Sequence, residues 1–155
     1  MSLIVYPYKR APFTGAMEDL TKDSLSAGFE KWRWQLWGSE AVRSFSCVLL
    51  PSLETGDIYA EGADLDQLEA EASLLLQHVD LIATHTGIGA YQIPLQGGPA
   101  RYMGTLDEDT AASLLAIQQI PQGGGTLLRE RLMNILAAVQ IAKEQGEGRG
   151  GVYIG

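Results

Sequence analysis

Two histidines are the first residues to consider, because imidazole commonly binds metals and transfers protons near neutral pH. His78 and His85 are the only two in the chain, seven residues apart in a segment that we expect to be helical. That spacing separates them by about 10.5 Å along the helix axis, whereas one metal ion needs both nitrogens within about 2.1 Å of itself. We therefore predict no metal site and no cofactor, and assign both histidines structural roles.

The single cysteine and the acidic pairs add little catalytic chemistry. Cys47 can form neither an intramolecular disulfide nor a cysteine-based zinc site, and its apolar neighbours predict a buried, inert thiol. Acidic pairs stand at expected helix starts, and no Ser-His-Asp, nucleophile-elbow or His-Glu-x-x-His pattern is present. These observations predict a binding protein rather than an enzyme, in a reducing, cytoplasmic compartment.

A glycine run at residues 122–126 precedes an expected helix and could offer backbone N–H groups to an anion. Arg129 and Arg131 follow one turn later and could add charge. However, the run lacks the spacing and the lysine of a phosphate-binding loop. A simple turn between two helices is the favoured interpretation.

The densest aromatic cluster contains Trp32, Trp34 and Trp37, interleaved with Lys31 and Arg33. Tryptophan and arginine are typical of protein–protein interfaces, although most tryptophans of a small domain belong to its core. On a strand, Trp37 would point away from the other two, so we expect at least one at the surface. We assign the three tryptophans to a partner-binding surface.

The charge of the chain is acidic and unevenly distributed. There are 19 Asp and Glu against 11 Lys and Arg, a net charge of -8. Residues 54–109 hold eleven of the acids and one base, Arg101. A negative surface repels nucleic acid and anionic membranes, which we exclude as partners, and attracts a basic protein. We expect a continuous anionic face that binds this partner through Glu61, Asp64, Asp66, Glu69 and Asp80.

A second hypothesis places a small-molecule site, catalytic or not, under an expected loop over residues 86–104. Tyr91, Arg101 and Tyr102 could line it, together with Arg129 from a later helix. A well-formed polar pocket beneath this loop would favour this alternative over partner binding.

Three principal helices are expected to position these residues. Apolar residues from Leu65 to Ile82 recur at spacings of three and four, which predicts one helix carrying both histidines, capped by Asp64 and closed by Gly87. A capping-box pattern predicts a second helix over residues 105–120. Residues 127–145 predict a third, apolar around most of its circumference, which suits a core position or a homodimer seam.

Short strands are expected at residues 3–6, ended by Pro7, at residues 57–60, and at residues 152–154 after a flexible glycine-rich segment, 145–151. We expect the last strand to dock on a sheet edge. Residues 29–50 fit two interpretations. Alternating polar and apolar residues favour a β-hairpin, whereas Gly38 as C-cap and Ser39 as N-cap would give two helices.

Together these elements predict a single α+β domain over residues 1–155, with three main helices packed on a small, mostly antiparallel β-sheet. The most apolar stretch, residues 132–142, is far shorter than the roughly twenty residues that cross a membrane. The leading functional hypothesis is a non-enzymatic, acidic protein-binding module. Toxin-neutralising immunity proteins are small acidic inhibitors of this general kind, so we expect an inhibitor-like role against a basic partner.

Overall fold

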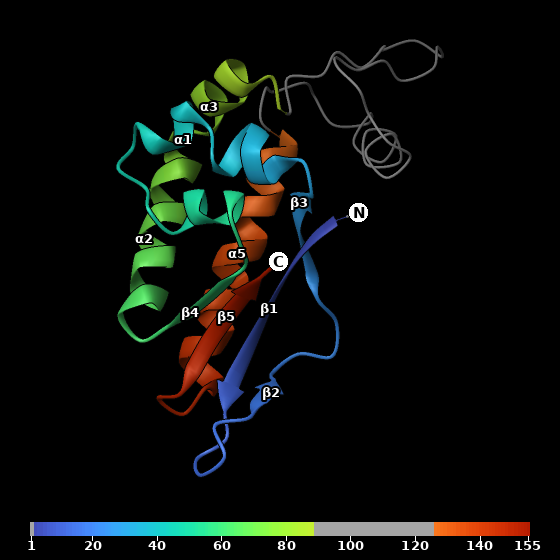
Figure 1. Cartoon of the computed structure of the whole chain (residues 1–155), viewed down its shortest axis with the longest axis vertical. Coiled ribbons are helices and arrows are strands. Elements are labelled where there is room, and N and C mark those ends of the chain that lie inside the picture. The colour runs from blue at the N-terminus through green and yellow to red at the C-terminus, as the bar shows by residue number, and fades with distance from the viewer. Residues whose placement is uncertain (1, 89–125) are drawn as a thin grey trace.

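The computed structural model describes residues 2–88 and 126–155, and these form an α+β fold (Figure 1). The strands make a five-stranded antiparallel sheet in the order β2-β1-β5-β4, with β3 also paired to β1. They are β1 (Ser2–Arg10), β2 (Met17–Asp19), β3 (Leu25–Phe29), β4 (Ile58–Glu61) and β5 (Gly150–Ile154). The longer helices are α2 (Ala63–Gln77), α3 (Val79–Thr86) and α5 (Thr126–Gln145). The predicted fold class is confirmed, while the predicted helix 105–120 lies outside the described residues.

The central strand, β1, is longer than its sequence predicts. It continues through Pro7, which we expected to end it, as far as Arg10. A proline lacks a backbone N–H and is rare inside sheets. Here its ring is buried and its carbonyl accepts a hydrogen bond from the Leu20 N–H at 3.0 Å. Because Pro7 does not interrupt it, β1 pairs along its length, with β5 on one side and with β2 and β3 on the other.

The sheet has one buried face, and alternation along the strands defines it. Leu3, Val5, Val152 and Ile154 are fully buried on this face. It packs against α5, whose residues Leu132, Ile135, Ala138 and Val139 are also fully buried, and α2 packs on α5 in turn. The apolar stripe proposed as a homodimer seam at 127–145 is thus largely used inside the chain, with Met133 left 56% exposed.

The predicted hairpin over residues 29–50 is wrong. After β3 the chain forms a π-helical turn, η1 (Arg33–Trp37), and a short helix, α1 (Glu40–Arg43). The hydrogen bond from the Gly38 N–H to the Arg33 carbonyl spans five residues, which brings Trp32 and Trp37 to the same side. Burial of these two indoles overrides the alternating pattern. The alternative cap positions were right, since Gly38 ends η1 and the Ser39 hydroxyl accepts the Val42 N–H.

The long helix predicted to carry both histidines is broken in two at His78. The apolar stripe itself is confirmed, from Leu65 to Ile82. At His78, however, φ is -118° and ψ is 24°, which is outside the helical region, and the imidazole stacks on the Phe45 ring at 4.9 Å. Gly87 closes α3 in the left-handed region as expected, but α2 begins after Gly62 with no side-chain cap, so Asp64 is not its N-cap.

A buried carboxylate ties the irregular segment to α2. Glu71, 3% exposed, accepts hydrogen bonds from the N–H groups of Val48, Leu49 and Leu50, each at 3.0 Å. These groups lie at the start of the 3-10 turn η2 (Leu50–Glu54), where a carboxylate satisfies otherwise orphaned donors. Burial, with Glu71 nearby, raises the pKa of the Cys47 thiol to about 12, in line with the predicted inert cysteine.

The final strand, β5, lies inside the sheet between β1 and β4 rather than on an edge. The glycine-rich segment before it forms a turn, in which the Arg149 N–H bonds the Gly146 carbonyl at 2.8 Å. A Cβ on Gly150 would collide with the Ala142 backbone of α5. The absence of a side chain there allows the chain to return directly from the helix to the middle of the sheet.

Candidate functional site

The outer face of the sheet carries a row of tyrosines, which we call the tyrosine face. Tyr6 on β1 pairs with Tyr153 on β5, and Tyr153 pairs with Tyr59 on β4. The ring centroids of each neighbouring pair are 5.0 Å apart. Tyr59 is 51% exposed, and the other two are half-buried. The register therefore creates an aromatic strip across three adjacent strands.

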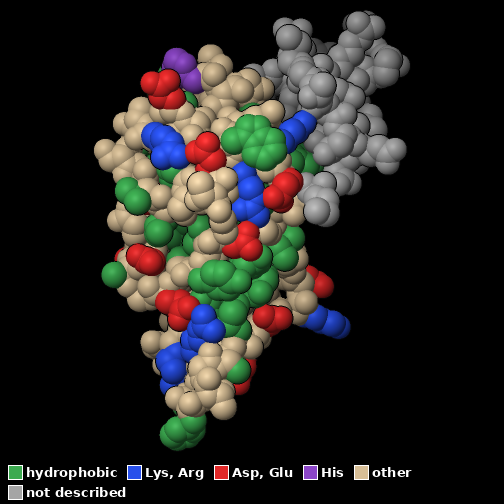
Figure 2. Space-filling model, in the orientation of Figure 1, with side chains coloured by type: hydrophobic (Ala, Val, Ile, Leu, Met, Phe, Trp, Pro, Cys, Tyr) green, Lys and Arg blue, Asp and Glu red, His purple; other side chains and the backbone are tan. Residues whose placement is uncertain are grey.

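No described helix covers this face. α5 passes behind the strands in Figure 1, on the buried face, and α2 lies to one side, packed on α5 and against β4. Figure 2, in the same orientation, shows hydrophobic side chains gathered over the middle of the strands, bordered by acidic and basic groups. A partly exposed aromatic strip on an uncovered sheet face is a candidate binding surface.

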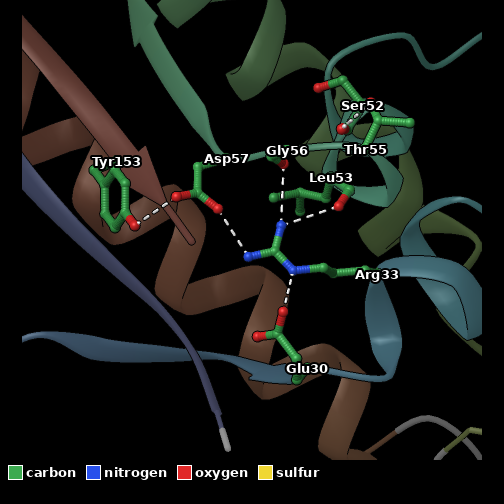
Figure 3. A network of polar contacts seen from close by, with 8 residues as sticks. All are labelled: Glu30, Arg33, Ser52, Leu53, Thr55, Gly56, Asp57 and Tyr153. Atoms are coloured by element: carbon green, nitrogen blue, oxygen red, sulfur yellow. Dashed lines mark hydrogen bonds and ion pairs between the residues drawn. The ribbon is translucent and has the colours of Figure 1, made fainter.

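One border of the tyrosine face is an arginine network around Asp57 (Figure 3). Arg33 Nη2 donates to Asp57 Oδ1 at 2.8 Å, and the Tyr153 hydroxyl donates to Asp57 Oδ2 at 2.9 Å. Arg33 Nη1 donates to the carbonyls of Leu53 and Gly56, each at 3.0 Å, and its Nε donates to Glu30. The guanidinium, whose side chain is only 15% exposed, joins η1 and η2 to the start of β4.

The opposite border has a second network of the same groups around Glu61, at the end of β4. The Tyr8 hydroxyl donates to Glu61 Oε2 at 2.6 Å, and Arg10 Nη2 donates to the same oxygen at 3.0 Å. The Arg10 guanidinium also lies over the Tyr8 ring, 5.3 Å from its centroid. Each border of the tyrosine face is thus an arginine, a carboxylate and a tyrosine hydroxyl.

These contacts fix the charges on the face. Hydrogen bonds from Arg33 and Arg10 hold the pKa values of Asp57 and Glu61 below their ordinary range, so both are carboxylates at neutral pH. Burial, followed by the bond to Asp57, raises the pKa of Tyr153 to about 12. Asp19 on β2 also raises the pKa of Tyr6, after burial, which places a third carboxylate close to the aromatic strip. Tyr6 and Tyr153 are therefore neutral at pH 7, and the carboxylates at the two borders, Asp57 and Glu61, are each paired with an arginine.

The acids expected to form one anionic face do not do so. Glu61 belongs to the outer sheet face, where Arg10 pairs with it. Asp66 and Glu69 lie on α2 and both contact Lys143 of α5, at 2.6 and 3.2 Å. Asp64 on α2 and Asp80 on α3 are exposed. Basic residues from distant parts of the sequence neutralise much of the acidic segment, because the fold brings β1, η1 and α5 against it.

The tryptophan cluster is divided between the core and the surface. Trp32 and Trp37 are 1% and 0% exposed and meet edge-to-face, so neither can contact a partner in this fold. Their assignment to a partner-binding surface is wrong. Trp34 is 54% exposed, as expected for at least one of the three. The five-residue spacing of the π-helical turn puts Trp32 and Trp37 in the core and leaves Trp34 at the surface. A two-residue period does not predict this division.

The alternative site cannot be built from the described residues. Tyr91, Arg101 and Tyr102, and the glycine run at 122–125, lie outside them, and Arg129 is exposed near the start of α5. His78 and His85 are both exposed, His78 at the helix break and His85 in the last turn of α3. Within residues 2–88 and 126–155, no group of three or more His, Cys, Asp or Glu side chains could hold a metal ion.

Sequence reasoning missed the tyrosine face, although a pattern pointed to it. Tyr6, Tyr59 and Tyr153 each occupy an alternate position in an expected strand, opposite the apolar residues that face the core. What the sequence lacks is the strand order that places them side by side.

In the part of the chain that the structure describes, no helix has the length and apolar character needed to cross a membrane.

Comparisons with protein-family models, with curated proteins and with solved structures find no match for this chain. The function is therefore inferred from the geometry of the tyrosine face itself.

Proposed function

We propose that this protein is a non-enzymatic protein-binding module, and that the tyrosine face binds a basic partner. The single observation that supports this is the in-register row of Tyr6, Tyr153 and Tyr59 on a sheet face that no described helix covers. An inhibitor-like or immunity-like role would follow if the bound surface were the one through which the partner acts. The buried free thiol of Cys47 supports a reducing, cytoplasmic location.

Tyrosine suits this role for physical reasons. It offers a large contact area with few rotatable bonds, so little conformational entropy is lost on binding. It is enriched among the residues that contribute most to interface affinity. The Arg33 and Arg10 networks hold the borders of the strip in place, so the surface is organised before a partner arrives.

The charges around the strip favour a cationic partner. The whole chain carries a net charge of -8, and Asp19 lies close to Tyr6, while Asp57 and Glu61 at the borders are each paired with an arginine. A lysine or arginine of the partner could lie over a tyrosine ring, an interaction worth about 0.5–1 kcal/mol at exposed sites, and still face a carboxylate. Nucleic-acid bases could also stack on the rings, but their phosphates would be repelled by the net negative charge of the whole chain.

The proposal is tested with three peptides of equal length, of alternating Gly-Arg, Gly-Lys and Gly-Glu sequence. A single-stranded oligonucleotide is the fourth probe. We expect the basic peptides to bind, with affinity falling as salt rises, and to shift the NMR signals of the Tyr6 and Tyr59 rings. The Tyr6→Ser/Tyr59→Ser variant, which leaves hydrogen-bonded Tyr153 intact, should weaken binding about tenfold or more.

Trp34→Ser provides the matched control, since it removes an exposed aromatic ring of η1 that is not part of the tyrosine face. It should change the affinity less than about twofold. The proposal would be contradicted by equal binding of acidic and basic peptides, by tighter binding of the oligonucleotide, or by loss of binding in Trp34→Ser but not in the tyrosine variant.

A further inference from the structure

The strand β4 forms one edge of the sheet, since it pairs with β5 and with no other described strand. An edge strand can accept an extended segment of another chain, because half of its backbone N–H and C=O groups face away from the sheet. The hydrogen bonds of the neighbouring strands determine which residues of β4 offer these groups.

The hydrogen bonds between β1 and the end of β5 fix the direction of each backbone group. The Ile4 N–H donates to the Gly155 carbonyl at 2.9 Å, and the Gly155 N–H donates to the Ile4 carbonyl at 3.1 Å. Gly155 therefore turns its backbone groups toward β1. Because backbone groups alternate in direction along a strand, Val152 and Ile154 turn theirs toward β4.

The same alternation decides which groups of β4 remain open. Ile58 and Ala60 lie opposite those two residues of β5, so their backbone groups hydrogen-bond to β5. The N–H and C=O groups of Tyr59 and Glu61 point away from the sheet. Within residues 2–88 and 126–155, no hydrogen bond to these backbone groups is present. An extended backbone is the ligand whose own N–H and C=O groups match them.

The strand β3, on the other side of β1, shows how this fold protects an edge. Its register with β1 shifts at Ala27, which makes a bulge. The Ala27 carbonyl accepts the Trp37 indole N–H at 3.3 Å, and the Ser26 carbonyl accepts the Asn134 amide at 2.9 Å. The strand β4 contains no bulge, proline or lysine, the features that discourage pairing with a further strand.

The side chains of an added strand would also have fixed positions. Residues directly opposite each other in an antiparallel pair project their side chains on the same face of the sheet. A partner residue whose backbone bonds Tyr59 therefore places its side chain on the outer face, beside the Tyr59 ring. The next partner residue projects toward the inner face, where Ile58 and Ala60 are buried and α2 packs against β4. A small side chain suits that position.

We propose that the basic partner adds an extended segment to the open edge of β4 as a further antiparallel strand, with cationic side chains alternating with small ones. This rests on the proposed function and specifies how the partner binds. The net charge of -8 favours a cationic segment, and a cationic side chain on the outer face lies beside the exposed Tyr59 ring. The bound segment widens the tyrosine face by one strand.

The alternating Gly-Arg peptide allows a direct test, because a methyl group on a backbone nitrogen removes one hydrogen-bond donor. In the proposed strand the arginine N–H groups face β4, while the glycine N–H groups face solvent. Methylation of every arginine nitrogen should therefore weaken binding about tenfold or more, and methylation of every glycine nitrogen should change it less than about twofold. The two peptides carry equal numbers of methyl groups, so each is the control for the other.

Amide hydrogen exchange of the full chain reports the same contact from the side of β4. Saturation with the unmethylated Gly-Arg peptide should slow exchange of the Tyr59 and Glu61 N–H groups about tenfold or more. The N–H groups of Ile58 and Ala60, already bonded to β5, should change much less and serve as the internal control.

Three results would each overturn the added strand. They are equal weakening by the two methylated peptides, greater weakening by the glycine-methylated one, and unchanged exchange of Tyr59 and Glu61 in the saturated complex. If the basic peptides still bind in these cases, the proposed function stands and only this mode of binding fails. If no basic peptide binds, both proposals fail.

Discussion

The two ends of β4 carry the same chemical groups in different surroundings. At the start, Asp57 is held by Arg33 and the Tyr153 hydroxyl, and at the end, Glu61 is held by Arg10 and the Tyr8 hydroxyl. The difference lies in the arginines. Arg33, at 15% exposure, also donates to two backbone carbonyls and to Glu30, whereas Arg10, at 35%, adds one carbonyl in the β1–β2 turn.

The burial of the tyrosines is reversed. Tyr8 in the Glu61 network is fully buried, while Tyr153 in the Asp57 network is half-exposed and belongs to the tyrosine face. Arg33, with all its side-chain nitrogens hydrogen-bonded, fastens the half-exposed Tyr153 of the tyrosine face to the irregular segment of η1 and η2 through Asp57. A partly exposed arginine beside a buried tyrosine fastens the hairpin to the sheet. Both networks thus lie on the outer face of the sheet, one around a half-exposed tyrosine and the other around a buried one.

Arg33→Ala should have the largest effect. The variant loses the hydrogen bonds that Arg33 donates to the Leu53 and Gly56 carbonyls and to the carboxylates of Glu30 and Asp57. We expect the free energy of unfolding to fall by about 2–3 kcal/mol. Urea denaturation measures it. Arg43→Ala is the control, since Arg43 pairs with Glu54 but is 51% exposed, and it should cost less than about 1 kcal/mol. Equal losses in both variants would show that Arg33 is an ordinary surface residue.

Gly151→Ala should disturb the Glu61 network next. An added Cβ would lie 2.6 Å from Tyr8 Cζ and 2.7 Å from Glu61 Cγ, and buried Tyr8 has little room to move. We expect a cost of about 1–3 kcal/mol from overpacking. Gly155→Ala places a Cβ against the Tyr153 hydroxyl and Asp57, which can move into solvent, so its effect should be smaller. Thermal unfolding of both variants ranks them, and the reverse order would contradict the contrast in burial.

Acid should weaken both networks. The pKa values of Asp57 and Glu61 are lowered in the folded protein, so each contributes stability above its unfolded pKa. That contribution disappears as the pH falls below about 4 and the carboxylates take up protons. Asp57→Asn and Glu61→Gln should each flatten the decline in stability between pH 5 and pH 2. The effect should be greater for Asp57→Asn, because its arginine is less exposed; an unchanged acid profile in both variants would show that neither network is linked to pH.

The smallest effect is a tyrosine titration. Burial, then the hydrogen bond to Asp57, raises the pKa of Tyr153 to about 12 from 10.0. A raised pKa favours the protonated phenol in the folded state, so its stabilising effect is complete below pH 10 and is lost as the pH approaches 12. Absorbance at 295 nm should show a tyrosine that titrates near pH 12, is missing in Tyr153→Phe and titrates earlier in Asp57→Asn. Tyr6 and buried Tyr8 also have raised pKa values, so the comparison of the variants identifies the Tyr153 step. An unchanged curve in both variants would place Tyr153 outside the network.

The elements with a strong period were predictable from the sequence. The third predicted helix is found as α5, the apolar stripe from Leu65 to Ile82 is buried, and the strand around residues 152–154 is present. Each of these follows from local burial along one face of the element. The hairpin error over residues 29–50 arose where the period misled, since Trp32 and Trp37 enter the core through a π-helical turn.

The sequence by itself determined the α+β class, the acidic charge, the inert cysteine and which strand positions carry tyrosine. These properties follow from composition and local pattern. Only the tertiary structure decided that Tyr6, Tyr153 and Tyr59 are neighbours, and that Arg10, Arg33 and Lys143 pair with four acids of the acidic segment. The physical reason is distance along the chain. Strand order and long-range ion pairs depend on which surfaces pack together, and no local period encodes that choice.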